Sequence, residues 1–349
     1  SASSTPSKKL KNNKYLMKVT ENKIDNLNLE LTLEVAAADY AEIEKKKLAE
    51  RRRTAEFKGF RKGMVPASLI KRVYGEQALV ESVNQVIGQA LDKHISEAGL
   101  RILGEPLASE KQPENEWADG NDFTFVFDLG LSPKVEVEVE KGDTVPTYTV
   151  TVAAKDKAPM IENLKKYYEE HKEDGQEAKT DEEIDKEVSE RLKSQYKNEA
   201  EWRLTKDIRD FFVKKADVQI PEEFLKRWLL EANGGKVSKE DIEKDFPGFA
   251  EDFKWQLVRG SLMQKWGFKV EDKDLQEQAE AFARYQYAMY GIGNVPDEMV
   301  KEMAVNMLQD QKQIERLVEQ VEDRKVLDKI KETITLKPTK ISAAKFREL

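Results

Sequence analysis

The sequence predicts an α+β protein: an N-terminal α+β domain with a small antiparallel sheet packed on a long helix, an extended connector, and an all-α C-terminal domain. Three observations lead to this fold class. Apolar and polar residues alternate at two places in the first 140 residues, as in strands with one buried face. A long segment between these places repeats its apolar residues with the helical period. Every pattern from Lys155 onward is helical.

The N-terminal domain is expected to span residues 17–140. Its first strand is predicted by the alternating residues Leu27, Leu29, Leu31, Leu33 and Val35. A helix capped by Asp39 and ending in the basic run 51–53 should follow. The long helix carries the apolar face Leu79, Val80, Val83, Val86, Ile87, Ala90, Leu91 and Ile95. Two more strands, at 123–131 and 135–139, should pair with the first strand.

Residues 141–179 are expected to form the extended connector, and residues 180–349 a set of helices joined by short loops. Thr180 and Glu183 have the spacing of a capping box at the start of one helix. Pro221 stands at the first position of another helix. A last long helical segment should start at Pro296.

The composition excludes most common catalytic and metal chemistry. The chain has no cysteine and only two histidines, His94 and His171, so thiol catalysis, disulfides and Cys-ligated metals are excluded. His94 lies on the apolar face of the long helix and is expected to pack in the core. No phosphate-loop, dinucleotide, nucleophile-elbow, zinc-protease or EF-hand motif occurs. The sequence therefore predicts no catalytic residue, no metal site and no cofactor.

Two features bear on where the protein is found. Residues 1–16 are polar and basic and lack the apolar stretch of a signal peptide, so they are expected to form a disordered tail ahead of Met17. No apolar run approaches the roughly 20 residues that cross a bilayer. The prediction is a cytoplasmic protein with no membrane partner.

The strongest signal is electrostatic. Residues 45–72 hold eleven Lys or Arg and two Glu, a local charge of +9 in a chain whose net charge is −8. The middle of this region reads FKGFRKGMVPA, with glycines on both sides of an aromatic residue that is followed by cations. Such a loop can present Phe60 to an apolar pocket while Arg61 and Lys62 reach phosphate or carboxylate. The alternative is a solvated helix end with a core phenylalanine, and the pattern leaves open whether the partner is RNA or an acidic protein.

The loop resembles the signature of a known family. Its sequence GFRKGMVP is similar to the GFRxGxxP signature of trigger factor, a family of bacterial ribosome-associated chaperones, at Gly59, Phe60, Arg61, Lys62, Gly63 and Pro66. The resemblance continues at ILGEP (102–106), in the strand at 123–131, and in IPEEFLKRW (220–228) and YGIGNVP (290–296). It covers nearly all of the chain from Met17, in the manner of Bacteroidetes-like members.

The resemblance implies a function. The N-terminal domain would dock on the large ribosomal subunit at the tunnel exit through the six signature residues, contacting a ribosomal protein and nearby rRNA. The C-terminal helices would form a body with arms that holds nascent or unfolded polypeptides without ATP. The resemblance also allows for a homodimer off the ribosome.

One departure from the family concerns enzymatic activity. Trigger factors usually carry an FKBP-like prolyl isomerase domain of about a hundred residues after the connector, and a stretch as short as 155–180 cannot hold one. The chain is therefore expected not to be an enzyme. The alternatives are a trigger-factor-type prolyl isomerase whose catalytic domain is absent from this chain, and an extracytoplasmic SurA-like chaperone.

Client-binding residues are predicted in the helical half, where large apolar residues exceed what one helix stripe needs. The candidates are Tyr285, Tyr287, Met289, Tyr290, Met299, Met303 and Met307. Methionine and tyrosine offer adaptable apolar surface for varied peptides. The alternative for each methionine is that it only fills a helix seam.

Overall fold

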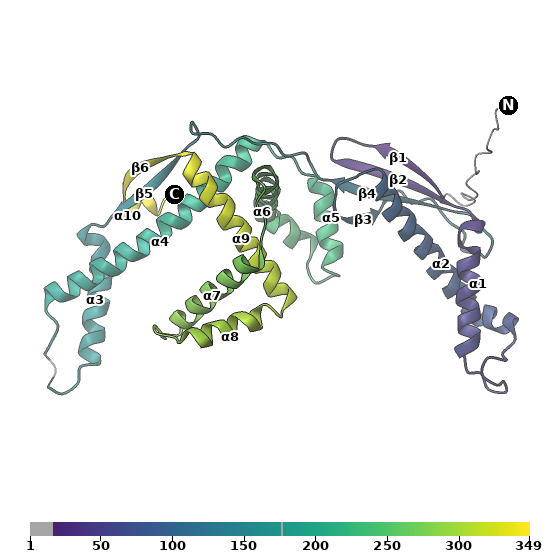
Figure 1. Ribbon diagram of the computed structural model, residues 1–349, viewed down its shortest axis with the longest axis horizontal. Coiled ribbons are helices and arrows are strands. Elements are labelled where there is room, and N and C mark those ends of the chain that lie inside the picture. Colours follow the sequence, from purple (N-terminus) through teal and green to yellow (C-terminus); the bar gives the residue numbers. More distant parts are fainter. Residues whose placement is uncertain (1–16, 176) are drawn as a thin grey trace, which may run out of the picture. The chain divides into compact units, whose positions relative to one another are not determined.

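The computed structural model describes residues 17–175 and 177–349, which fold into two compact units (Figure 1). The first unit contains the described residues up to Lys134 and a later segment, Gln219–Pro247. The second unit contains Val135–Val218 and Gly248–Leu349. The predicted tail, residues 1–16, lies outside the described residues. The α+β fold class is confirmed, with a small antiparallel sheet near the N-terminus and mostly helices after it.

The sheet of the first unit has the strand order β1-β2-β4-β3 and is antiparallel throughout. Its strands are β1 (Lys18–Lys23), β2 (Asn28–Val35), β3 (Ile102–Ala108) and β4 (Phe123–Leu131). The two predicted strands are β2 and β4, and they pair directly. The sequence pattern predicts neither β1 nor β3, because β1 is almost entirely polar and β3 contains glycine and proline.

Two helices form a hairpin beside this sheet. Helix α2 (Ala67–Glu97) packs its apolar face on the alternating residues of β2, so Leu31, Leu33 and Val83 are fully buried. Helix α1 (Ala37–Thr54) begins after Ala36, three residues earlier than its predicted cap. Asp39 instead accepts a hydrogen bond from the Ala36 N–H at 2.7 Å, which satisfies a free donor of the first turn.

A helix from far along the chain completes the first unit. Helix α5 (Glu222–Ala232) packs on β3 and β4, where glycines allow close approach. Gly104 has φ of +63°, and a Cβ there would lie 2.7 Å from the Trp228 ring. The Arg227 Nη1 donates to Asp128 Oδ2 at 2.8 Å. The sequence pattern assigns this helix to the C-terminal domain, and only its packing places it here.

The second unit is not all-α, contrary to our prediction. Strands β5 (Thr144–Thr151) and β6 (Thr335–Ser342) form a parallel pair, and α10 (Ala343–Phe346) follows. The predicted connector at 141–179 is therefore not a free-standing segment, because β5 lies in it. The strand β6 was missed because its sequence, TLKPTKIS, is mostly polar and includes a proline.

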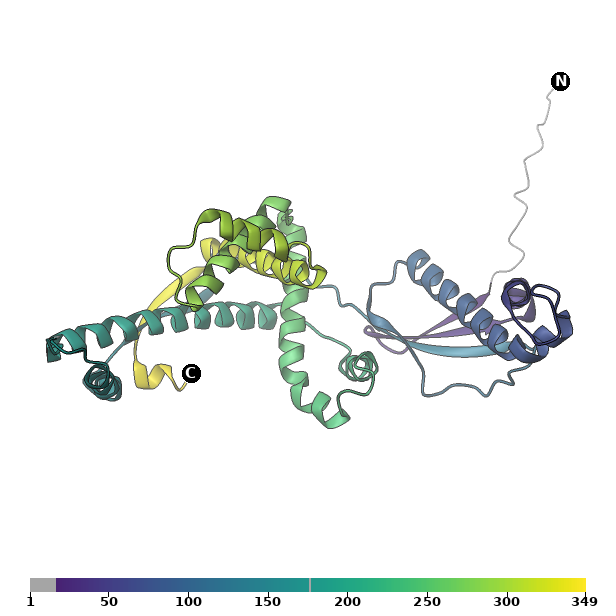
Figure 2. The ribbon, with the colours of Figure 1, turned by 90° about the horizontal axis from the view of Figure 1, so that it is seen from below.

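Two helices pack with this pair of strands. They are α3 (Ala154–Glu170) and α4 (Asp181–Ala216) (Figure 2). They share a core with the strands through Leu164, Val188, Tyr196, Tyr148 and Phe346. The predicted capping box of α4 is confirmed, since the Thr180 hydroxyl accepts from the Glu183 N–H at 3.2 Å.

The predicted strand at 135–139 is wrong. Within residues 132–143 the structure has no strand, although the Val137 side chain is buried as its alternation suggested. Two of its carbonyl oxygens accept side-chain donors where a strand would have had ladder partners. Ser261 Oγ donates to Val135 O at 2.7 Å, and Lys215 Nζ donates to Glu138 O at 2.8 Å.

Four more helices follow in sequence: α6 (Lys239–Trp266), α7 (Asp272–Met289), α8 (Asp297–Met307) and α9 (Gln311–Thr333). The predicted single segment after Pro296 is thus two helices. They are separated at Asp310, whose carboxylate accepts from the Lys312 N–H at 2.9 Å and starts α9. No helix within the described ranges is long and apolar enough to cross a membrane.

The helices α4, α6 and α9 are joined by one carboxylate, Asp323. Trp255 Nε1 and Arg259 Nη1 each donate to its Oδ1 at 2.9 Å, and Arg209 Nη2 lies 2.7 Å from its Oδ2. The Arg259 side chain is only 8% exposed. Asp323 therefore neutralises a buried cation and satisfies a buried indole N–H.

Candidate functional site

The six predicted signature residues all lie in one loop, residues 55–66, between α1 and α2. We call it the signature loop. It contains two tight turns, closed by hydrogen bonds from Phe60 N to Phe57 O at 3.1 Å and from Met64 N to Arg61 O at 2.9 Å. Gly59 and Gly63 have φ values of +92° and +84°, which side chains other than glycine adopt only with strain. The two glycines of the motif therefore set the loop's shape.

The base of the loop is anchored in a small core. Val65 and Ile70 are buried there with Ala55, and the Phe57 ring packs edge-on against Tyr74 at 6.3 Å between centroids. Arg52 Nε donates to the Val65 carbonyl oxygen at 2.7 Å. These contacts attach both ends of the loop to α1 and α2.

The tip presents its side chains to solvent. Phe60 is 45% exposed, and Arg61 and Lys62 are exposed beside it. Phe60 is therefore not the core phenylalanine of the alternative interpretation, because Phe57 occupies that position. The structure brings the six residues together, while their role in docking stays a prediction. Sequence reasoning missed Met64, which is 66% exposed and follows the second turn glycine.

A cavity of about 410 Å³ lies between α1 and α2, the two helices that the signature loop connects. Glu44 lines it, and its side chain is nearly buried with Oε1 lacking a hydrogen-bond partner. Burial and the Asp119 carboxylate raise the pKa of Glu44 to about 7. A hydrogen bond from Lys71, whose Nζ lies 2.5 Å from Asp119 Oδ2, lowers the pKa of Asp119. Glu44 and Asp119 thus share one proton near neutral pH.

This pair predicts a pH dependence of stability. The folded-state pKa of Glu44 is above its ordinary value, so between about pH 4.5 and about pH 7 the unfolded chain loses this proton while the folded chain keeps it. The free energy of unfolding therefore falls as pH rises through this range. Replacing Glu44 by Gln removes the charge, and should raise the free energy of unfolding above about pH 7 by up to about 3 kcal/mol. Urea unfolding at about pH 5 and about pH 8 measures this. The exposed Glu42→Gln on the same helix is the control, and equal pH profiles for both variants would refute the assignment.

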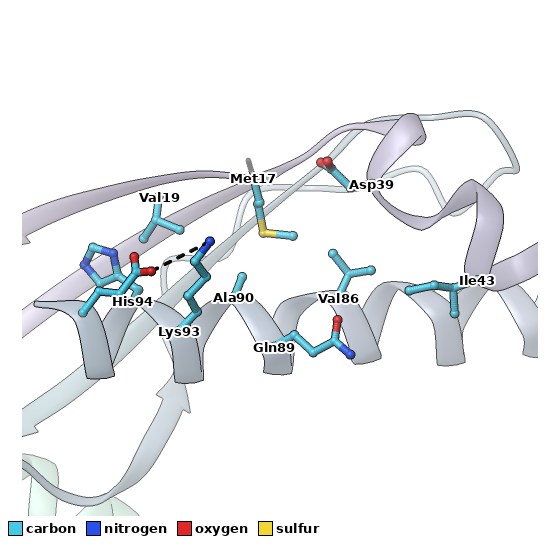
Figure 3. Close-up of a pocket in the computed structure, with 10 residues that line it drawn as sticks. Met17, Val19, Asp39, Ile43, Val86, Gln89, Ala90, Lys93 and His94 are labelled. Atoms are coloured by element: carbon cyan, nitrogen blue, oxygen red, sulfur yellow. Dashed lines mark ion pairs between the residues drawn. The ribbon is translucent and has the colours of Figure 1, made fainter. Parts of the chain in front are cut away.

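A second cavity, of about 360 Å³, lies between β1 and α2 (Figure 3). Met17, which immediately precedes β1, lines its apolar part together with Val19 of β1 and with Val86 and Ala90 of α2. His94 lies at one end and is not fully packed in the core as predicted. Its Nε2 lies 2.7 Å from Glu21 Oε1, which makes it a partly exposed hydrogen-bond partner of β1.

The helical hairpin of α7 and α8 carries several of the predicted client-binding residues. Its turn and adjoining helix ends hold an exposed apolar group, which we call the apolar tip: Tyr285 (60% exposed), Met289 (68%), Tyr290 (79%), Ile292 (48%) and Met299 (46%). Arg284 and Asp297 form an ion pair across the hairpin at 3.0 Å. Ile292 was missed because its neighbours are mostly glycine and asparagine, without helical periodicity.

The remaining predicted client-binding residues are less exposed. Met307 is 7% exposed and packs with Ala279, Ala304 and Leu317, so its prediction as surface for clients is wrong. Met303 and Tyr287 are half-buried. The helix face that points to α7 and α9 buries Met307, which corresponds to the helix-seam alternative.

Among the described residues of 155–180, where an isomerase site would have to lie, the aromatic side chains form no enclosure. The Tyr167 ring stacks on His171 at 4.3 Å between centroids and is 53% exposed. The Tyr168 hydroxyl donates to Glu187 Oε2 at 2.7 Å, and Lys179 Nζ lies 4.4 Å from the centre of its ring. Tyr168 thus joins α3 to α4, while Tyr167 contacts only residues at its own end of α3. Across residues 17–175 and 177–349, no cluster of three or more metal-ligating side chains is found.

Comparison with known proteins gives two matches to sequence models of one family. "Bacterial trigger factor protein (TF)" matches residues 17–164, and "Probable trigger factor, C-terminal domain" matches residues 200–349. The first match contains the signature loop with both flanking helices. The second contains the apolar tip and Asp323.

Individual relatives agree with these matches. The trigger factor of Francisella tularensis subsp. novicida (strain U112) is 31% identical over 152 residues, which are 44% of this chain and 34% of that protein. The trigger factor of Azospirillum brasilense is 32% identical over 148 residues, which are 41% of this chain and 32% of that protein. The chain thus spans about a third of the length of the curated relatives it matches.

A solved structure shows a similar fold. It is described as "Promiscuous Substrate Recognition in Folding and Assembly Activities of the Trigger Factor Chaperone", and it superposes with a TM-score of 0.53 at 15% sequence identity. The superposition covers 90% of this chain and 99% of that one. With an N-terminal and a C-terminal match to the same family, relatives of that family and this fold, the chain belongs to the trigger factor family.

Proposed function

We propose that this chain is an ATP-independent chaperone that docks on the large ribosomal subunit and holds nascent or unfolded polypeptides. The observation that carries the docking half is the signature loop. It is anchored at its base, its shape is set by two glycines, and it presents Phe60 with cations in a region of local charge +9. A net charge of −8 for the whole chain gives no general attraction to RNA, so the attraction is local.

Co-sedimentation with ribosomes at two salt concentrations tests the docking proposal. The chain should pellet with ribosomes at low salt, and binding should weaken as salt rises, since contacts of Lys and Arg with phosphate release counterions. Absence from the ribosome pellet at low salt would overturn the proposal. We place the protein in the cytoplasm because ribosomes are its proposed partner. The alternative of an extracytoplasmic SurA-like chaperone offers no role for the basic loop.

The holding function is proposed for the helical part, residues 180–349, with its apolar tip as one client-binding surface. Three of its side chains, Tyr285, Met289 and Tyr290, are each at least 60% exposed. Contact of apolar surface with water is unfavourable, and binding of an apolar client removes that contact. Methionine adapts its shape to different partners, and tyrosine can bond to peptide groups as it packs. The division into a docking domain, 17–140, and a connector, 141–179, is part of the same proposal.

Replacing Tyr285, Met289 and Tyr290 together by Ser should impair the holding function. Loss of their apolar area should weaken binding of an unfolded polypeptide on the order of tenfold. Light scattering of a chemically denatured protein diluted with the full chain, without ATP, measures this. Tyr167→Ser is the matched control, because Tyr167 is 53% exposed on another helix of the same unit. Full suppression of aggregation by the triple variant would count against the apolar tip.

We propose further that this chain does not catalyse prolyl isomerisation. Rotation about an X-Pro bond has a barrier of ~18 to 20 kcal/mol, and lowering it requires a site that binds the twisted bond better than the planar one. Tyr167 and Tyr168 do not form such a site. A fluorogenic X-Pro peptide assay without protease should show the spontaneous rate. Faster turnover at substoichiometric protein would show a site elsewhere.

A further inference from the structure

One edge of β4 is closed by a loop and not by a strand. The ladder between β3 and β4 ends at Ala108, and residues 109–122 continue as a loop along the rest of β4. We call these residues the edge loop. Alternate residues of a strand direct their backbone groups to opposite neighbours. Thr124 and Val126 accordingly turn their N–H and C=O groups toward the edge loop and away from β2.

Two side-chain amides take the place of the missing strand. The Thr124 N–H donates to Asn115 Oδ1 at 2.9 Å, and Asn115 Nδ2 donates to the Thr124 carbonyl oxygen at 2.8 Å. The Val126 N–H donates to Gln112 Oε1 at 3.1 Å, and Gln112 Nε2 donates to the Val126 carbonyl oxygen. A primary amide carries a donor and an acceptor side by side, as a peptide group does. The edge loop thus imitates two residues of a neighbouring strand.

The middle of the edge loop is held by few contacts. None of residues 110–118 is buried. Besides the two amides, the Trp117 ring holds this part by packing on Phe123 at 4.8 Å between ring centroids, and Trp117 itself is 41% exposed. Hydrogen bonds that face water contribute little to stability, because water replaces them when they break.

Both ends of the edge loop are fixed more firmly. At the start, the N–H of the buried Ser109 donates to the Val126 carbonyl oxygen at 2.9 Å. Near the end, the hydroxyl of the buried Tyr40 donates to the Asn121 carbonyl oxygen at 2.8 Å. Opening of the loop between these anchors breaks the amide contacts and leaves the core of the first unit intact.

We propose that the edge loop is a displaceable cover, and that the edge of β4 at Thr124 and Val126 is a docking site for an extended polypeptide segment. The segment would add to the sheet as a short strand. Each of these two residues directs one donor and one acceptor out of the sheet, and an extended peptide backbone supplies the matching groups at the strand repeat. A phosphate backbone has no donor and cannot replace the amides.

This site differs from the apolar tip in what it recognises. Its contacts are made with the backbone of the partner, so large apolar side chains on the partner are not required. The edge loop competes with the partner, which lowers the apparent affinity by the fraction of molecules in which the loop is open. The inference does not rest on ribosome docking or on binding of clients by the apolar tip.

Replacing Gln112 and Asn115 together by Ala should uncover the edge. Hydrogen exchange of the full chain, followed residue by residue, should be about tenfold faster at the Thr124 and Val126 N–H groups, because their acceptors are gone. The matched control is Glu114→Ala, an exposed residue of the same loop between the two amides, which should leave the exchange rates unchanged.

A labelled peptide of alternating threonine and valine, with one lysine at each end, tests docking by fluorescence anisotropy. The unmodified chain should bind it weakly, and saturating peptide should slow exchange of the Thr124 and Val126 N–H groups. The double variant should bind about tenfold more tightly, because the loop no longer competes. Glu114→Ala should bind as the unmodified chain does. Replacement of the three apolar-tip residues by Ser should not change binding of this peptide, so the two proposals can fail separately.

Two outcomes would overturn the inference. Unchanged exchange at Thr124 and Val126 in the unmodified chain under saturating peptide would show that nothing docks at this edge, and this reading needs no substitution. Self-association of the double variant in size-exclusion chromatography, without tighter peptide binding, would mean that the loop only prevents pairing of edges between copies of the chain. Far-UV circular dichroism and urea midpoints establish that each variant is folded.

Discussion

Replacing Phe60, Arg61 and Lys62 together by Ala is expected to lower the affinity for ribosomes by roughly thirtyfold to a thousandfold. The change removes an exposed aromatic side chain and two cations from the tip of the signature loop. Residues of these types at the centre of an interface contribute about 2 to 4 kcal/mol as a set, which converts to that range of affinities. Ribosome co-sedimentation across protein concentrations measures the effect.

The triple variant should fold normally. The loop is held by Val65, Ile70 and the Phe57–Tyr74 contact, none of which is changed. Its circular dichroism and urea midpoint should therefore match those of the unmodified chain. Exposed basic residues at another place serve as the control: Lys18→Ala and Lys23→Ala on β1 remove two charges without touching the loop. Equal ribosome binding by the triple variant and this control would refute the docking role of the loop.

Replacing Asp323 by Ala is expected to lower the free energy of unfolding by about 3 to 5 kcal/mol. The carboxylate accepts hydrogen bonds from Trp255 and Arg259 and pairs with Arg209, so its loss leaves a buried cation and a buried indole N–H without their partner. Glu322, 3.1 Å from Arg259, keeps part of the charge balance. Urea unfolding followed by far-UV circular dichroism measures the loss.

The matched control for this substitution is Asp328→Ala on the same helix, because Asp328 is exposed. It should change the free energy of unfolding by no more than about 0.5 kcal/mol. Asp323→Asn should lower the free energy of unfolding by an intermediate amount, since the amide keeps one acceptor oxygen but carries no charge. Equal stability of Asp323→Ala and Asp328→Ala would show that the three contacts contribute nothing.

The candidate site could be predicted from the sequence as far as its signals were local. The signature loop was found because glycines at positions 59 and 63 and the cations between them are adjacent in the chain. The capping box at Thr180 was found for the same reason, since all its atoms lie within one helical turn. By contrast, exposure of Met64 and burial of Met307 could not be predicted, because each depends on what other segments cover. Met64 is exposed because its neighbour Val65 takes the buried position, and Met307 is buried because α7 and α9 cover it.

By itself the sequence determined the buried strands β2 and β4, the long helix α2 and the helical character of the second half, because side-chain periodicity records which face of an element is apolar. Only the tertiary structure decided which elements are partners. It placed α5 on β3 and β4, paired the polar strand β6 with β5, and joined α4, α6 and α9 at Asp323. The physical reason is that these pairings arise between residues far apart in the chain, from 64 positions for Arg259 and Asp323 to about 190 for the paired strands β5 and β6. Their free energy comes from shape, hydrogen bonding and charge across the contact, which no periodicity along one segment encodes.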